Sequence, residues 1–131
     1  MMKPAKDSLD LGVVVRDINA SLNFYQNILG LEFVGIMPLW FGTMHRLRFG
    51  TSDFKLIEPK TIPPQGAIGL ESQLGFRYVT FVIKNLSQLC SELKEMEIEF
   101  ALPETNSHGQ GPGWKYRGIC GKKLKKEKRT K

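Results

Sequence analysis

The spacing of hydrophobic residues predicts a strand, a helix and three more strands in the first half of the chain. Leu9–Val15 is an apolar run that ends in β-branched residues, which is typical of a buried strand. Asp17 or Asn19 is placed to cap a helix, and Gly30 to end it in a left-handed conformation. The residues predicted for the buried face of this helix are Leu22, Tyr25, Ile28 and Leu29. The later strands are predicted at Leu31–Met37, Thr43–Phe49 and Phe54–Glu58, the last two forming a hairpin around Gly50-Thr51-Ser52-Asp53.

The same pattern starts again after Pro63-Pro64-Gln65-Gly66, which reads as a linker. Tyr78–Ile83 predicts a second buried strand, Asn85 a second helix cap, and Ile98–Leu102 a strand after the second helix. A constant offset aligns the apolar faces of the two helices, through the pairs Ile18 and Leu86, Leu22 and Cys90, Tyr25 and Leu93, and Ile28 and Met96. We interpret this match as an internal duplication.

Strand parity predicts which side chains face the helix in each copy. In the first strand Leu11, Val13 and Val15 are expected to lie against the helix, with Asp10, Gly12 and Val14 on the opposite face. In the second copy the helix side holds Val79, Phe81 and Ile83, and the opposite side holds Tyr78, Thr80 and Val82. The opposite face mixes polar and small residues in both copies, which suits a cavity wall better than a packed core.

Composition limits the classes of protein to consider. With 131 residues, 41% of them hydrophobic, the chain is long enough for one domain with its own core. No apolar run is long enough to span a membrane, no signal peptide is evident, and two cysteines are too few for a disulfide framework. We therefore expect a cytoplasmic protein.

The net charge of +6 belongs to the end of the chain. Residues 121–131 contain seven basic side chains and one acidic one, so the first 120 residues are neutral. A basic tail can bind nucleic acid or an anionic surface, but no aromatic or structured basic face accompanies it. We expect no nucleic-acid partner, and the tail is interpreted as a solvated segment.

Several segments together resemble the vicinal oxygen chelate superfamily, which includes glyoxalase I, extradiol dioxygenases and bleomycin-resistance proteins. The matching segments are Leu9–Asp17, Ser21–Tyr25, Leu29–Phe33, Leu56–Glu58 and Gly75–Asn85. The resemblance implies an α+β fold in which two βαβββ modules form a curved mixed sheet around a cleft. The modules would span about residues 8–60 and 75–119, joined by a linker at 61–74 and followed by the tail at 120–131. The last strand of the second module would be missing.

The resemblance also implies four possible metal-ligand positions, which this chain fills incompletely. Metal-dependent relatives place one ligand on the first strand and one on the fourth strand of each module, and the metal acts as a Lewis acid. Here these positions fall on Asp10, Glu58, Tyr78 and Lys126. Glu58 matches the usual residue, Asp10 is a possible oxygen ligand, Tyr78 is a weak ligand, and Lys126 offers none.

Glu58 is the most specific candidate for a catalytic or metal-binding side chain. It shares strand parity with Phe54 and Leu56, so we expect it to point into the cleft among apolar neighbours. A carboxylate there needs a metal, a cationic partner or a raised pKa. The alternative for Glu58 is a solvent-exposed position at the rim before Pro59, and for Asp10 a solvated position at the start of a strand.

The remaining candidates are aromatic or polar residues expected near the cleft. They are Trp40, His45, Tyr78, Thr80, Trp114 and Tyr116. Trp40, Trp114 and Tyr116 could form a wall for a flat ligand. Tyr78 could equally be an ordinary aromatic residue of the sheet, and a single His on a strand, such as His45, is more often structural than a ligand or base.

Two functional classes remain open at this point. The first is a binding protein for a small aromatic or oxygen-rich molecule, with no complete metal site. The second is a lyase, isomerase or dioxygenase with Glu58 as metal ligand or general base, and a non-functional relative is a third possibility. The cofactor is accordingly none or a divalent metal. We also expect a homodimer that covers the edge left by the missing strand.

Overall fold

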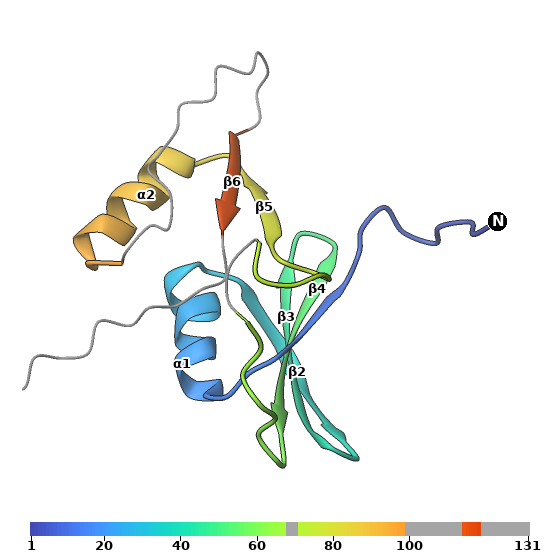
Figure 1. Ribbon diagram of the computed structural model, residues 1–131. Helices are drawn as coiled ribbons and strands as arrows, with labels where there is room; N and C mark the ends of the chain where they lie inside the picture. The colour runs from blue at the N-terminus through green and yellow to red at the C-terminus, as the bar shows by residue number, and fades with distance from the viewer. Residues whose placement is uncertain (68–70, 99–113, 119–131) are drawn as a thin grey trace, which may run out of the picture. The chain divides into compact units, whose positions relative to one another are not determined.

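The computed structural model describes residues 1–67, 71–98 and 114–118, in two compact units with a boundary between Gln65 and Gly66 (Figure 1). The first unit contains β1 (Leu11–Val14), α1 (Ile18–Leu22), a π-helical turn (Asn23–Ile28), β2 (Glu32–Leu39), β3 (Gly42–Phe49) and β4 (Ser52–Pro59). The second contains β5 (Val79–Ile83), α2 (Leu86–Glu95) and β6 (Trp114–Gly118). No helix among the described residues is long and apolar enough to cross a membrane.

The first unit is a complete βαβββ module. Its four strands form an open, curved sheet in the order β1-β4-β3-β2, with β1 parallel to β4 and the other neighbours antiparallel. The predicted α+β class and the predicted order of elements are confirmed. The hairpin turn is tighter than predicted, because Ser52 and Asp53 already belong to β4, and Gly50 takes the positive φ of 58°.

The first helix begins as predicted but does not continue as a regular α-helix. The backbone N–H of Ala20 donates to Asp17 Oδ1 at 3.0 Å, so Asp17 and not Asn19 is the cap. From Asn23 the helix widens, and the N–H of Leu29 donates to the carbonyl of Phe24 at 2.9 Å. Gly30 then ends the helix with a φ of 83°, as its position predicts.

The core of the first unit lies between this helix and one face of the sheet. Leu47 and Leu56 have no exposed surface, and Phe54 is 3% exposed. The Tyr25 ring, on the π-helical turn, packs on the ring of Phe54 with centroids 4.7 Å apart. The even-numbered positions 54 and 56 of β4 therefore face the helix, and positions 53, 55, 57 and 59 face the other way.

The second unit repeats the strand and the helix but pairs them differently. Exposure alternates along β5 as predicted, and Cys90 and Leu93 are buried on α2. Asn85 occupies the N-cap position, but its side chain makes no capping hydrogen bond. Strand β5 pairs with β6 in antiparallel fashion, from Val79 opposite Gly118 to Ile83 opposite Trp114. The strand predicted at Ile98–Leu102 lies almost entirely outside the described residues.

Candidate functional site

An apolar pocket of about 440 Å³ lies at one end of the first unit. It is formed by the end of β1, the β2–β3 turn, the end of β4 and the segment that follows β4. Its lining residues are Val14, Trp40, Phe41, Pro59, Lys60, Thr61 and Pro63. The volume falls in the range of small-molecule sites, which are typically several hundred cubic ångströms.

Close approach of β3 and β4 positions the aromatic side of this pocket. Gly42 pairs with Pro59, and a Cβ at Gly42 would lie 2.2 Å from the carbonyl oxygen of Glu58, so only glycine fits. The backbone N–H of Lys60 donates to the carbonyl of Phe41 at 2.8 Å, and Lys60 Nζ donates to the carbonyl of Trp40 at 2.9 Å. The two-residue turn Trp40-Phe41 is therefore held at both of its carbonyl groups.

The two rings of this turn form an exposed aromatic edge. The Trp40 and Phe41 rings lie 5.0 Å apart, edge to face, and Trp40 is 87% exposed. Burying the apolar surface of an indole is favourable, and an exposed indole does not gain this free energy until a ligand or partner covers it. Next to an apolar pocket, this edge is suited to stacking on a flat, apolar molecule.

The pocket residue Val14 begins an apolar row on the sheet face opposite α1. Val14 is opposite Ile57 in the β1–β4 register, and Met44 and Met37 continue the same row across β3 and β2. Partners in register project from the same face of a sheet. Among the described residues, the row of this face next to the pocket is therefore apolar. That the face forms the wall of a cavity remains a prediction.

A charged cluster lies further along the same face. Arg46 donates to Asp53 Oδ2 from Nη2 at 2.7 Å and from Nε at 3.3 Å, and Arg48 Nη2 lies 3.4 Å from Asp53 Oδ1. The Arg46 hydrogen bond is the main cause that holds the pKa of Asp53 below its usual value, outweighing desolvation. Asp53 is thus a buried anchor for two arginines.

Asp10 fixes the segment that precedes β1. Its Oδ1 accepts from Lys6 Nζ at 2.6 Å and from the backbone N–H of Asp53 at 2.9 Å. The bond from Lys6 and then the bond from Asp53 lower the pKa of Asp10. The carboxylate is therefore used in local hydrogen bonds, and a metal would have to displace them.

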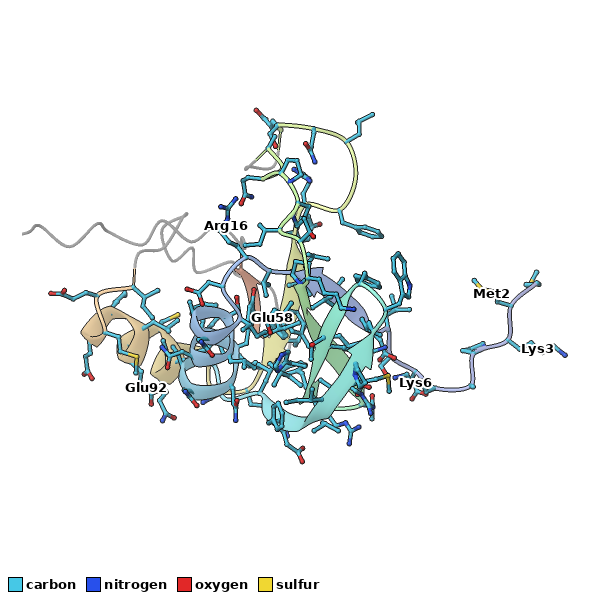
Figure 2. All side chains as sticks on the ribbon, turned by 90° about the horizontal axis from the view of Figure 1, so that it is seen from below. Met2, Lys3, Lys6, Arg16, Glu58 and Glu92 are labelled. Carbon is cyan, nitrogen blue, oxygen red and sulfur yellow. The ribbon has the colours of Figure 1, made fainter. Side chains whose placement is uncertain are left out.

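Glu58 lies on the other side of the sheet, the side that α1 covers (Figure 2). Its Oε2 is 3.6 Å from His45 Nε2, and its side chain is 48% exposed. His45 is 9% exposed, and neither ring nitrogen has a hydrogen-bond partner among the described residues. The register thus brings together two predicted site residues, His45 and Glu58, on the helix side and away from the face of Asp10.

The residues of the first unit do not fit a metal site. Asp10 lies beside Asp53, five residues along β4 from Glu58 and so roughly 16 Å away, on the opposite face. Within the described residues, no three His, Cys, Asp or Glu side chains gather where they could hold a metal ion. Asp10 and Glu58 therefore cannot bind one ion together in this arrangement.

The other predicted site residues belong to the second unit. Tyr78 immediately precedes β5 and is 58% exposed, and Thr80 is an exposed residue of β5 opposite Arg117. Trp114 and Tyr116 are opposite Ile83 and Phe81 in the β5–β6 register. Their role at a ligand site remains a prediction.

Sequence reasoning found Trp40 but missed most of the pocket around it. The missed residues are Phe41, Pro59, Lys60, Thr61 and Pro63, whereas Val14 was predicted to lie on the face opposite the helix. One signal was present: a glycine directly after Trp40-Phe41 marks a close backbone approach. Lys55 was also missed, although it alternates with Phe54 and Leu56 and so had to project from the face opposite the helix.

Comparisons with known proteins agree with this fold. A sequence model of the Glyoxalase/Bleomycin resistance protein/Dioxygenase superfamily matches residues 9–114. The crystal structure of SMU.1112c is similar with a TM-score of 0.63 at 20% identity, covering 73% of this chain and 78% of the other. The glyoxalase family protein from Enterococcus faecalis is similar with a TM-score of 0.52 at 19% identity, covering 70% and 71%. None of the curated proteins compared with the chain matches it.

The complete βαβββ module and the family match lead to one conclusion: the chain belongs to the glyoxalase, bleomycin resistance protein and dioxygenase superfamily.

Proposed function

We propose that this protein binds a small, flat aromatic molecule in the pocket beside Trp40. The observation that supports this most is an apolar pocket of about 440 Å³ with an exposed pair of aromatic rings at its edge. Gly42 and Lys60 hold the backbone of that edge in place, which supports a site whose backbone is formed before the ligand binds. A preformed site loses little conformational entropy on binding.

The proposal contains no metal-dependent step. Asp10 is occupied by Lys6 and by the Asp53 backbone, and Glu58 lies on the opposite face next to His45. An enzyme that uses Glu58 as a general base is the alternative, and it would require the substrate to reach the helix side of the sheet. The pocket, which includes Val14 on the other side, supports binding in preference to that chemistry.

Isothermal titration calorimetry with 2-naphthamide, a neutral aromatic probe, tests the binding proposal. We expect saturable binding with one site per chain, weakened about tenfold or more by Trp40→Ala and largely retained by Trp40→Phe. Phe76→Ala removes an aromatic side chain that is 95% exposed and lies outside the pocket, and it serves as the matched control. Absence of binding to the unmodified chain, or an equal loss in Phe76→Ala, would refute the proposal.

We propose as well that two copies of the chain associate. In the described part of the second unit, β5 and β6 form a two-stranded sheet, and an isolated pair of strands is marginally stable in water. A second copy can cover or extend such a sheet through its unpaired backbone groups. Sedimentation velocity at micromolar concentration should give a dimer, and a monomer alone would contradict this proposal.

A further inference from the structure

One row of residues crosses all four strands of the first unit next to the apolar row. In register, Gly12 of β1 lies opposite Lys55 of β4, Lys55 opposite Arg46 of β3, and Arg46 opposite Gly35 of β2. These residues project from the face opposite α1, the face to which Val14 of the pocket belongs. Two cations thus lie side by side in the middle of the sheet, with a glycine on each side.

The glycines leave open space beside the two cations. A Cβ added at Gly35 would meet no atom within 4 Å, and one added at Gly12 would meet only Ile57 Cδ1 at 3.7 Å. Neither glycine is therefore required by a close backbone contact within the described residues. What they do provide is room above the sheet on both sides of the Lys55 and Arg46 side chains.

Among Lys6, Arg46, Arg48 and Lys55, the cations on or beside this row, only Lys55 has no carboxylate within 4.0 Å in the described part of the chain. Among the described residues, Lys60 at the pocket also has no carboxylate partner, and its Nζ donates to the Trp40 carbonyl. Lys6 pairs with Asp10 at 2.6 Å, and Arg46 and Arg48 share Asp53. Lys55, which is partly buried, has no carboxylate within 4.0 Å and no hydrogen bond among the described residues, and its charge acts only weakly and at longer range on Asp10, which Lys6 already pairs. An ammonium group has three donors, and Arg46 uses two of its five on Asp53. The row can therefore accept one additional negative charge.

The distance from this row to the pocket suits a small molecule. Side chains on one face of a strand repeat every second residue, about 6.6 Å apart. Lys55 is one such step from Ile57 and two from Pro59, and Gly12 is one step from Val14. A ligand with its ring against Val14 and Trp40 would thus place a substituent on its far side near Lys55.

We propose that the ligand is an aromatic monocarboxylate whose ring occupies the pocket and whose carboxylate is bound by Lys55 with help from Arg46. This inference rests on the proposed function and adds the charge of the ligand and the residue that selects it. A monoanion is favoured over a phosphate because, of the two cations in this row, only Lys55 has no ion pair within 4.0 Å among the described residues. Lys55 acts here as a specificity residue, since a neutral aromatic ligand would still bind through the pocket.

Calorimetry with two matched probes tests the role of Lys55. 2-Naphthoate and 2-naphthamide share the same ring system and differ in charge. We expect 2-naphthoate to bind about tenfold more tightly, because hydrogen bonds to charged groups are the stronger ones. Lys55→Met should remove that advantage and leave the affinity for 2-naphthamide unchanged, and Lys55→Arg should retain most of it. Lys3→Met, which removes an equal charge from an exposed position, is the control.

The possible outcomes separate the two proposals. If both probes bind equally, and Lys55→Met changes neither affinity, the carboxylate proposal is wrong and the aromatic site stands. If neither probe binds to the unmodified chain, the proposed function itself fails. If Lys3→Met weakens 2-naphthoate binding as much as Lys55→Met does, the effect comes from net charge and the assignment of Lys55 is overturned. Near-ultraviolet circular dichroism of each variant will show whether its fold is intact.

Discussion

In each of the two units, residues 1–65 and 66–131, the first described elements are a strand and then a helix, but the two strands belong to different sheets. In the first unit β1 lies parallel to β4 at the edge of a four-stranded sheet, and two leucines are buried without exposed surface. In the second, β5 lies antiparallel to β6, and the described helix buries Cys90 and Leu93. A strand followed by a helix is thus paired differently in the two units.

The difference shows that the pairing of the first strand depends on the strands that follow the helix. A parallel pair needs a crossover, and in the first unit the helix together with β2 and β3 supplies it. The hairpin β3–β4 also supplies Leu47 and Leu56, the most buried side chains of the chain's described residues. We therefore expect the first unit to hold most of the stability of the protein, and the pocket lies on this unit.

The largest expected effect comes from the core of the first unit. Leu56→Ala should lower the free energy of unfolding by about 2–5 kcal/mol, because it leaves a cavity between sheet and helix. Denaturant unfolding of the whole chain measures this loss. Ile36→Ala, at a position 61% exposed on β2, should change it by only about 0.5 kcal/mol. A larger loss from Leu93→Ala in α2 than from Leu56→Ala would reverse the comparison between the units.

The contact of β3 with β4 provides the next test. Gly42→Ala should cost about 1–3 kcal/mol, because the new Cβ would overlap the backbone carbonyl of Glu58. Gly12→Ala is the matched control, since its Cβ would make only an ordinary contact with Ile57. Thermal unfolding of the two variants compares them directly. Equal melting temperatures would show that β3 and β4 are not as tightly apposed as the structure has them.

The two helix caps compare the units residue by residue. Asp17→Ala should lower stability by about 1 kcal/mol, because the Asp17 carboxylate accepts the Ala20 N–H. Asn85→Ala at the corresponding position should have little effect, because the Asn85 side chain makes no capping bond. Urea denaturation of both variants measures the difference. A greater loss from Asn85→Ala would show that the second helix depends on its cap after all.

The smallest expected effect is on the pH dependence of stability. The folded-state pKa values of Asp53 and Asp10 lie below the ordinary value of 3.8. Each lowered pKa contributes stability above the unfolded-state value, and that stability is lost as the pH falls through the folded-state pKa. Unfolding midpoints should therefore drop as the pH falls below about 4, and less steeply in Asp53→Asn. Asp7→Asn, which removes a carboxylate from an exposed position, is the control for the change in net charge.

The sequence predicted the elements of the first unit because its local signals agree with one another. Asp17, Gly30 and the hydrophobic spacing each act within a few residues. The cap at Asp17, one of the two predicted, and the end at Gly30 are confirmed, whereas the first strand is shorter than predicted and leaves Leu9 89% exposed. The π-helical turn at Asn23–Ile28 was not predicted, because hydrophobic spacing does not distinguish a π-helical turn from a regular α-helix over six residues. The antiparallel pairing of β5 with β6 likewise depends on contacts distant in sequence.

The candidate site was harder to predict than the fold. Parity correctly grouped Glu58 with Phe54 and Leu56, but parity alone does not say which face of the sheet carries a pocket. That choice depends on where the helix packs, and the Tyr25–Phe54 contact places it on the side of Glu58. The pocket residues Pro59 and Pro63 lie in a segment that the sequence indicated only as a chain break and a linker.

The tight fit at Gly42 has a consequence for how this family member can diverge. Substitution at Gly42 is blocked by a backbone atom that no neighbouring side-chain change can move aside. Trp40 and Phe41, directly before it, project from the turn and are constrained mainly through their backbone carbonyls. Selection can therefore exchange the two aromatic side chains, and with them the preferred ligand, while the strand pairing that supports them is inherited unchanged.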